Sequence, residues 1–201
     1  PQAQAGENAL ICQDEVVVLG EDYSGFTGLT FEWSSSGGLD IFSKANPVVQ
    51  PVESNHYFLK VTNKNGCADF DTVFIEVNPE IIVNAGTDVD ICIGDSVIIG
   101  GTPAASGSLF DYTYQWLPAI GLSKTTIPNP MVSPSGDQQY VLEVRSGDCA
   151  AEYDTVMVFV HPLPEVTVSP QQSVGPDESV QLVATGGTVY EWSPEELLDD
   201  P

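Results

Sequence analysis

The chain has 201 residues, and its 29 Asp and Glu against five Lys and Arg give a formal net charge of −24. A surface this acidic repels phosphate backbones and anionic lipid headgroups, so we expect no nucleic-acid partner and no membrane insertion. The apolar fraction of 42% is sufficient for packed cores, and there is no apolar run of about 18 residues of the kind that crosses a membrane.

The same elements recur along the chain in the same order, which predicts tandem domains with a period of about 80 residues. We expect repeat 1 at residues 1–79, repeat 2 at 80–162 and an incomplete repeat 3 at 163–201. The recurring elements are Ile11-Cys12 and Ile91-Cys92; Phe31-Glu32-Trp33, Tyr114-Gln115-Trp116 and Tyr190-Glu191-Trp192; Asn46-Pro47 and Asn129-Pro130; Cys67 and Cys149; Asp71-Thr72-Val73 and Asp154-Thr155-Val156.

Within each repeat the apolar residues alternate with a period of two. The stretches 57–61 and 73–77 each place three apolar residues on one face of a strand. Turn residues separate the strands, and no convincing amphipathic helix is present. This pattern predicts an all-β fold of immunoglobulin-like antiparallel β-sandwiches in tandem.

The cysteines occupy matched positions in the two complete repeats. We therefore predict one disulfide in each, Cys12–Cys67 and Cys92–Cys149. Metal ligands or a redox pair are the alternatives, but the close Cys-x-x-Cys spacing that is typical of such sites does not occur in the sequence. Each bond would stabilise its domain by about 4 kcal/mol on the chain-entropy model and would place the protein in an oxidising compartment. Gly175 stands at this position in repeat 3, which we expect to lack the bond.

Aromatic residues pose a choice between packing and ligand binding. The three tryptophans share one repeat position, and each has an aromatic residue two positions earlier on the same strand face, which predicts buried pairs rather than sugar-stacking platforms. Other aromatic residues fall in the longer loops before the tryptophan strand, where they would contact a ligand or fold over the end of the sandwich. These loop residues are Tyr23, Phe26 and Tyr112.

Pairs of acidic residues precede several strands. Hydrogen bonding to a neighbouring turn is one interpretation, and calcium binding is the other, because hard cations take clustered carboxylate oxygens. No loop with the EF-hand pattern is present. The candidates are Asp69, Asp71, Asp88, Asp90, Glu152 and Asp154. We predict no other cofactor.

The sequence offers no catalytic motif. His56 and His161 lie in different repeats without a recognisable partner, and neither a nucleophile elbow nor a phosphate-binding glycine loop occurs. We therefore predict that the chain is not an enzyme.

The order Ile-Cys-x-Gly-Asp-Ser-Val, Tyr-x-Trp-x-Pro, Gly-Leu, Asn-Pro, Tyr-x-Leu-x-Val, Cys and Asp-Thr-Val resembles the PKD-like or Ig-like repeats of large Bacteroidota surface proteins. These include gliding-motility adhesins exported by type IX secretion. Repeat 2 matches best, whereas repeat 1 replaces the Trp-x-Pro element and repeat 3 loses its cysteine. The resemblance implies an extracellular protein of the cell surface with a role in cell adhesion.

The resemblance also implies O-glycosylation, since Bacteroidota modify Ser or Thr between Asp and an aliphatic residue. Three positions fit this rule, and strand parity predicts that their hydroxyls point outward. They are Thr72, Ser96 and Thr155.

From these patterns we expect a structural stalk segment of a secreted adhesin, with neighbouring repeats of the same chain as its first partners. One rival hypothesis is a module that binds a surface polysaccharide or another surface protein through loop aromatics and acidic residues. The other is an accessory region of a secreted hydrolase. Fold resemblance alone does not separate these functions.

Overall fold

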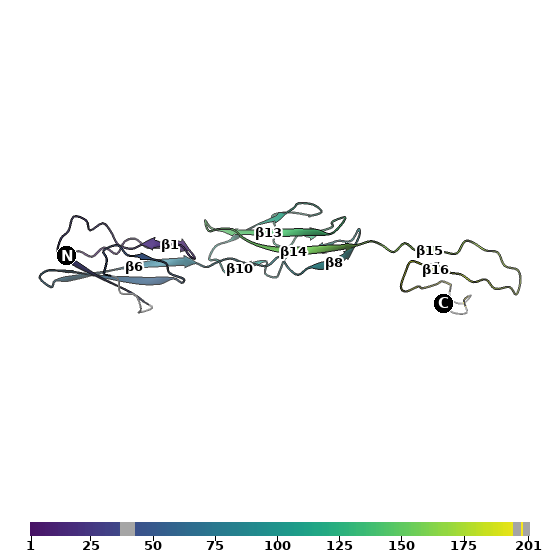
Figure 1. Cartoon of the computed structure of the whole chain (residues 1–201), viewed down its shortest axis with the longest axis horizontal. Coiled ribbons are helices and arrows are strands. Elements are labelled where there is room, and N and C mark those ends of the chain that lie inside the picture. The colour runs from purple at the N-terminus through teal and green to yellow at the C-terminus, as the bar shows by residue number, and fades with distance from the viewer. Residues whose placement is uncertain (37–42, 195–197, 199–201) are drawn as a thin grey trace.

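The computed structural model describes residues 1–36, 43–194 and 198. The regular elements in these ranges are β-strands, and the repeats follow one another along the long axis of the molecule (Figure 1). Within the described ranges, no helix is long and apolar enough to cross a membrane. The predicted all-β class is confirmed.

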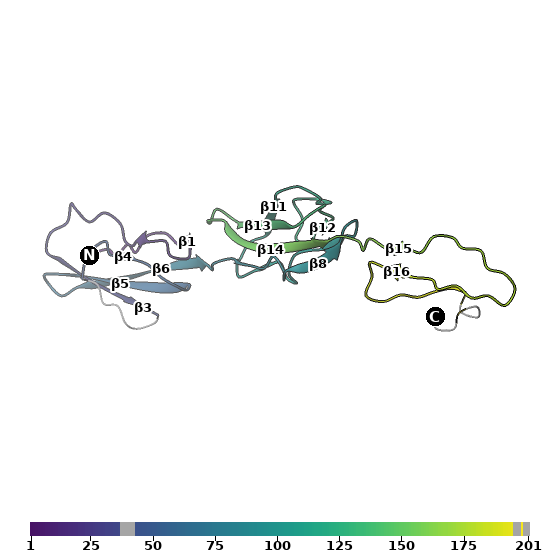
Figure 2. The same cartoon turned by 45° about the vertical axis from the view of Figure 1, so that its right-hand side comes forward.

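Repeat 1 folds as a sandwich of two sheets (Figure 2). The larger sheet has the strand order β1-β6-β5-β3, and the smaller sheet pairs β2 with β4. Strand β1 runs parallel to β6, while β5 runs antiparallel to both β3 and β6. The strands are β1 (Ala9–Cys12), β2 (Val17–Val18), β3 (Leu29–Ser35), β4 (Val48–Val49), β5 (Asn55–Asn63) and β6 (Ala68–Asn78).

Repeat 2 has the same plan. Its larger sheet has the order β11-β13-β14-β8, with β8 parallel to β14, and its smaller sheet pairs β9 with β12. A further short pair joins β7 to β10. The strands are β7 (Ile82–Val83), β8 (Val89–Cys92), β9 (Val97–Ile98), β10 (Ala105–Ser106), β11 (Tyr112–Leu117), β12 (Met131–Val132), β13 (Gln138–Ser146) and β14 (Glu152–His161).

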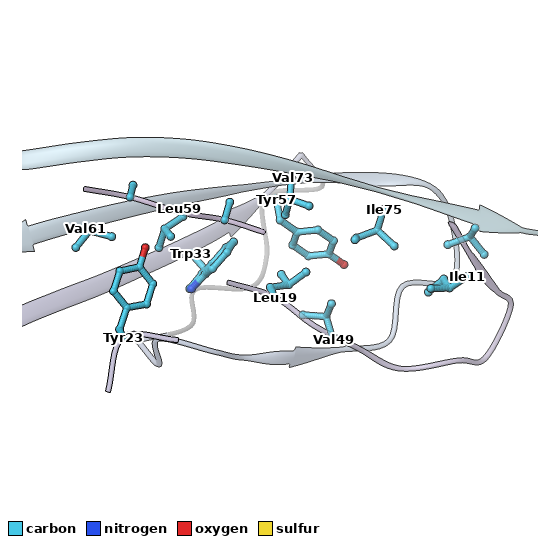
Figure 3. Packing of buried hydrophobic residues seen from close by; sticks show 13 residues of the cluster. Ile11, Leu19, Tyr23, Trp33, Val49, Tyr57, Leu59, Val61, Val73 and Ile75 are labelled. Carbon is cyan, nitrogen blue, oxygen red and sulfur yellow. The ribbon is translucent and has the colours of Figure 1, made fainter. Parts of the chain in front are cut away.

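The core of repeat 1 lies between its two sheets (Figure 3). Trp33 is 1% exposed, and its indole Nε1 donates a hydrogen bond to the carbonyl of Lys44 at 3.1 Å. The alternating residues of β5 and β6 point toward it and are buried, as predicted. In repeat 2, Trp116 is fully buried and donates in the same way to Ile127 at 3.0 Å. The tryptophans of both complete repeats are therefore core residues, as predicted.

An aspartate of each last strand holds the segment that enters the sandwich. Asp71 Oδ2 accepts a hydrogen bond from the buried Ala5 N–H at 2.7 Å. Asp154 Oδ2 accepts one from Ala85 N–H at 2.8 Å. Ala5-Gly6 recurs in the sequence as Ala85-Gly86, and this element and the recurring Asp-Thr-Val element are thus two halves of one contact, which fixes the N-terminal segment against the last strand.

We expect Asp71→Ala to destabilise repeat 1 by about 1–3 kcal/mol, because the buried Ala5 N–H would lose its acceptor. Denaturant unfolding measures this loss. The matched control is Glu76→Ala on the exposed side of the same strand, which should change stability by less than about 0.5 kcal/mol. Equal effects of the two substitutions would show that the Asp71 contact contributes nothing specific.

Repeat 3 has no core among its described residues. It contains β15 (Thr167–Val168) paired with β16 (Ala184–Thr185), and none of its residues in the range 163–194 is buried. Trp192 is only partly covered, so the prediction of a buried tryptophan is wrong for this repeat. The reason is physical: the partner strands that cover Trp33 and Trp116 have no counterpart among the described residues here.

Candidate functional site: the junction between repeats

The junction between repeats 1 and 2 is the most elaborate polar site of the described chain. Strand β6 runs toward repeat 2 and ends at Asn78, and a single residue, Pro79, connects it to Glu80 at the start of repeat 2 (Figure 1). Strand β1 ends beside it, since Cys12 pairs with Asn78 in the parallel register. The last strand pair of repeat 2 turns toward this end, between β13 and β14.

A disulfide crosses the junction. Cys12 at the end of β1 is bonded to Cys149 in the turn between β13 and β14, with a Cα–Cα distance of 5.7 Å and a sequence separation of 137 residues. Cys67 and Cys92 are unpaired and exposed. The predicted pairs Cys12–Cys67 and Cys92–Cys149 are therefore wrong: the bond joins two repeats instead of closing one.

Strand direction explains the correction. Cys12 lies beside the last residue of β6, whereas Cys67 immediately precedes the first residue of this 11-residue strand. At about 3.3 Å per residue, the two cysteines of repeat 1 lie roughly 35 Å apart, while a disulfide requires Cα atoms within about 7 Å. The same holds in repeat 2, where Cys92 pairs with His161 at the end of β14 and Cys149 precedes its start.

Asn78 connects the two repeats by hydrogen bonds beside the disulfide. Its side chain is 1% exposed, and its Oδ1 accepts bonds from Leu109 N–H at 2.8 Å and from Ser108 Oγ at 2.9 Å. Its Nδ2 donates to Cys149 Sγ at 3.3 Å. One buried amide of repeat 1 is therefore satisfied by groups of repeat 2, so separating the repeats would leave it without these partners.

Repeat 2 preorganises its side of the junction. Ser146 is 2% exposed, and its Oγ lies 2.7 Å from Ser108 Oγ. The Ser146 hydroxyl also lies at hydrogen-bond distance from the carbonyl oxygens of Phe110 and Asp111, at 3.0 and 3.1 Å, and can donate to them. These contacts hold the loop before β11 against the end of β13, and so present Ser108 to Asn78.

Sequence reasoning missed these polar residues. Asn78 is not among the predicted site residues, although a polar residue directly after the buried Val77 is a signal for a satisfied contact. Ser146 continues the inward parity of Val144, and a hydroxyl at a core-facing position is a signal of the same kind.

Four of the six predicted calcium ligands, Asp69, Asp71, Asp88 and Asp154, accept hydrogen bonds from backbone N–H groups. Asp69 Oδ2 accepts from Ala3 N–H at 2.8 Å, and Asp88 Oδ1 accepts from Met157 N–H at 2.8 Å. Asp90 Oδ1 lies 2.6 Å from His161 Nε2, with both side chains largely exposed. Glu152 lies beside the junction. Across residues 1–36, 43–194 and 198, no group of three or more His, Cys, Asp or Glu side chains gathers as a metal site.

The loop aromatics have structural partners. Tyr23 is 8% exposed, packs edge-on against Phe31 with ring centroids 4.8 Å apart, and accepts a hydrogen bond from Gln4 N–H at 2.6 Å. Burial raises the pKa of Tyr23 above its ordinary value. The prediction that Tyr112 lies in a loop is wrong: it is the first residue of β11, it is half-buried, and its hydroxyl accepts a hydrogen bond from Ser108 N–H at 3.1 Å, so it supports the junction loop. Phe26 is 67% exposed, and its ring makes an edge-type contact with the ring of Tyr23.

The three candidate glycosylation positions are exposed. Thr72 and Thr155 lie on the outer faces of β6 and β14, next to the buried Val73 and Val156, as strand parity predicts. Ser96 is exposed just before β9.

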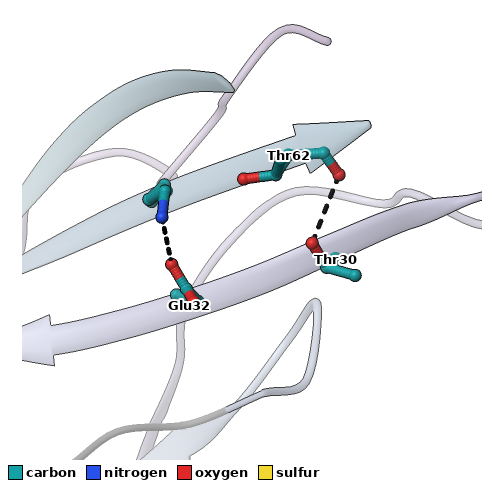
Figure 4. A network of polar contacts seen from close by, with 4 residues as sticks. Thr30, Glu32 and Thr62 are labelled. Atoms are coloured by element: carbon teal, nitrogen blue, oxygen red, sulfur yellow. Dashed lines mark hydrogen bonds and ion pairs between the residues drawn. The ribbon is translucent and has the colours of Figure 1, made fainter. Parts of the chain in front are cut away.

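The outer face of the larger sheet in repeat 1 carries polar contacts and exposed aromatics. Lys60 Nζ lies 2.6 Å from Glu32 Oε2, and Thr30 donates to the Thr62 carbonyl at 3.3 Å (Figure 4). A shallow hollow beside them is flanked by Phe58 and Phe70, which are 44% and 70% exposed. Because both ions are solvent-exposed, the pair contributes little to stability, about 0–1 kcal/mol.

Comparison with known proteins finds likeness only in structure. No family model matches the chain, and no curated protein matches it. A titin I-band fragment, I67–I69, is 12% identical, with 80% of this chain and 65% of the fragment covered and a TM-score of 0.49. The insect immune protein hemolin is 12% identical over 78% of this chain and 46% of its own, with a TM-score of 0.45.

A two-domain structure of DIP-gamma, IG1+IG2, is 11% identical over 77% of this chain and 94% of its own, with a TM-score of 0.43. The class to which the chain belongs follows from its own strands: it is a tandem of immunoglobulin-like β-sandwiches. A disulfide in such a protein fits an oxidising environment.

Proposed function

We propose that this chain is a spacer segment of a larger extracellular cell-surface protein, of the type found in Bacteroidota adhesins exported by type IX secretion. Its consecutive sandwiches form a stalk that keeps its length under tension. The observation that carries this proposal is the Cys12–Cys149 bond, because a disulfide across a domain junction fixes one domain on the next.

The bond also determines how tension passes through the chain. A pull on the two ends enters at the N-terminal segment, crosses from Cys12 to Cys149 through the disulfide, and leaves along β14. The residues between the two cysteines lie in a closed covalent loop, so tension does not extend them. Most of repeat 1 and most of repeat 2 lie in this loop.

The charge of the chain supports an extended arrangement. A net charge of −24 makes neighbouring repeats repel one another, which opposes collapse of a string of domains onto itself. The short linker at Pro79 limits the orientations available at the first junction. The buried hydrogen bonds of Asn78 also limit the orientations at this junction.

Small-angle X-ray scattering of the oxidised chain and of Cys12→Ser tests the stiffness of the junction. We expect the variant to keep both folded sandwiches and to show a broader distribution of interdomain distances, because the junction is then restrained by the short linker and by hydrogen bonds alone, without a covalent bond. Cys67→Ser, which removes an unpaired thiol, should scatter like the parent chain. Identical curves for all three would contradict a disulfide that stiffens the stalk.

The exposed Phe58 and Phe70 favour a second candidate function, a glycan-binding face, since exposed aromatic rings beside charged groups can stack on sugars. A glycan panel, probed with calcium and then with EDTA, tests it. Saturable binding that is lost in Phe58→Ala and Phe70→Ala would replace the spacer function by a binding function. Binding that depends on calcium would additionally support the predicted carboxylate site.

O-glycosylation completes the proposal for a Bacteroidota surface protein. The exposed hydroxyls of Thr72, Ser96 and Thr155 are sterically open to modification. Intact-mass measurement on protein from its native source should exceed the polypeptide mass by whole glycans. A mass equal to the polypeptide minus its disulfide hydrogens would contradict it.

A further inference from the structure

The two unpaired cysteines occupy the same repeat positions as the two bonded ones. Cys92 ends β8 in repeat 2 as Cys12 ends β1 in repeat 1. Cys67 lies in the turn before β6 as Cys149 lies in the turn before β14. Each repeat therefore carries one cysteine at each of its two ends, and the bond at the first junction uses one of each kind.

The backbone around Cys92 reproduces that around Cys12. Cys92 pairs with His161 in the same parallel register in which Cys12 pairs with Asn78. In the turns that follow, Asp95 N–H donates to the Cys92 carbonyl at 3.0 Å, and Glu15 N–H donates to the Cys12 carbonyl at 3.1 Å. Cys92 thus lies, exposed, at the end of repeat 2 that faces repeat 3.

Cys67 lies at the opposite end of the molecule. Strand β6 runs from Cys67 toward repeat 2, so the turn that contains Cys67 faces away from repeat 2 (Figure 1). The thiol is exposed there, with its backbone N–H donated to Asn63 Oδ1 at 3.1 Å. It occupies, relative to repeat 1, the position from which Cys149 reaches back to Cys12.

We propose that Cys67 and Cys92 form disulfides with neighbouring repeats of the same type in the natural chain. Cys92 pairs with a cysteine in the turn before the last strand of repeat 3, and Cys67 pairs with a cysteine at the end of the first strand of a repeat on its N-terminal side. The proposal is argued from the geometry of the first junction. It also rests on the proposed spacer function, because it requires that repeats of this type continue in the protein.

Each bond forms by an ordinary exchange. Two thiols lose two protons and two electrons and become one disulfide, while a disulfide oxidant of the compartment takes them up and is reduced to two thiols. The oxidising environment that maintains Cys12–Cys149 supplies this oxidant class.

Repeat 3 has no cysteine at the position from which Cys12 and Cys92 would bond to a following repeat. Gly175 occupies the turn position of Cys12 and Cys92, since Glu178 N–H donates to the Gly175 carbonyl at 3.2 Å and Gly175 N–H donates to Glu178 Oε2 at 2.8 Å. The equivalent Cys12 N–H donates to Glu15 Oε2 at 2.9 Å. Under this proposal, Gly175 removes the bond from repeat 3 to the repeat that follows, and not a bond within repeat 3.

The linker into repeat 3 is longer than that into repeat 2. Three residues, 162–164, separate His161 from Glu165, whereas Pro79 alone separates Asn78 from Glu80. Two additional residues add about 7 Å of reach. A bond from Cys92 would therefore restrain a junction that its linker leaves looser than the first.

The test is peptide mapping of the full-length protein that carries this segment, isolated without reductant, alkylated and digested. We expect Cys92 and Cys67 each in a cross-linked peptide whose other half comes from a different repeat. Alkylated Cys67 and Cys92, or a Cys67–Cys92 bond, would overturn the proposal. If Cys12–Cys149 is found and Cys92 is alkylated, the inference fails and the spacer function stands; if Cys12–Cys149 is absent, both fail.

A second test supplies the missing partner directly. A chain of residues 1–162 followed by a second copy of residues 80–162 leaves one residue, Pro162, between His161 and the appended Glu80, as Pro79 alone separates Asn78 from Glu80 at the first junction. We expect the Cys92 of the first copy to become protected from alkylation by bonding to the Cys149 of the appended copy, while Cys67 remains reactive. The Cys12–Cys149 bond in the same molecule reports correct folding. Cys92 as reactive as Cys67 in that folded molecule would overturn the proposal.

Discussion

Pulling a single oxidised molecule by its ends is expected to give a total extension about 450 Å shorter than pulling the reduced molecule. The difference arises because the Cys12–Cys149 bond encloses a loop with a sequence separation of 137 residues, and tension bypasses that loop. Force spectroscopy before and after treatment with thiol measures it.

Two variants make the comparison specific. Cys12→Ser should show the long extension without reductant, because Cys149 then has no partner at the junction. Cys67→Ser should keep the short extension in the absence of thiol and the long one in its presence. Equal extensions of the oxidised and reduced parent chain would show that tension does not pass through the disulfide.

Trp116→Ala is expected to destabilise repeat 2 by about 3–5 kcal/mol and to lower its unfolding midpoint by roughly 15 °C or more. The side chain is fully buried in the core of repeat 2, and its Nε1 hydrogen bond to Ile127 is lost as well. Thermal unfolding followed by near-ultraviolet circular dichroism measures the shift.

Trp192→Ala is the matched control, since Trp192 has the same repeat position but only partial cover. We expect its effect to stay within about 0.5 kcal/mol. A comparable loss of stability in both variants would mean that repeat 3 has a core of its own, contrary to the exposure of its described residues.

The sandwich fold could be predicted from the sequence because the buried residues of a strand are the apolar ones that recur at every second position. The inward residues of 57–61 and 73–77 are the buried ones, and Trp33 and Trp116 lie between the sheets. The alternation of apolar residues is a local signal that repeats at every second position, so it can be recognised without knowledge of the tertiary structure. Trp192 fails the same prediction because the described residues of repeat 3 provide no strands that cover it.

The disulfide pairing could not be obtained by matching repeat positions. Position in a repeat identifies equivalent cysteines, but two pairings satisfy it: one within each repeat and one between consecutive repeats. The distinction depends on the direction of the first strand, which is parallel to the last strand and therefore ends far from the turn that precedes it. That parallel pairing is a long-range contact, which alternation of apolar residues does not encode.

The acidic residues show a similar limit. The sequence shows Asp69 and Asp71 as a pair, and it is compatible both with calcium binding and with hydrogen bonding to a neighbouring turn. In the structure they accept hydrogen bonds from Ala3 and Ala5, far away in sequence. The recurring Ala-Gly element was visible in the sequence, but nothing in it indicated which carboxylate it would contact.

The most direct test of the covalent junction is peptide mapping of this chain under non-reducing conditions. The protein is alkylated in denaturant without reductant, digested, and the linked peptides are identified by mass spectrometry. We expect one cross-linked species that joins the Cys12 and Cys149 peptides, with Cys67 and Cys92 alkylated. Cross-links Cys12–Cys67 and Cys92–Cys149 would contradict the junction and return the disulfides to the interiors of single repeats.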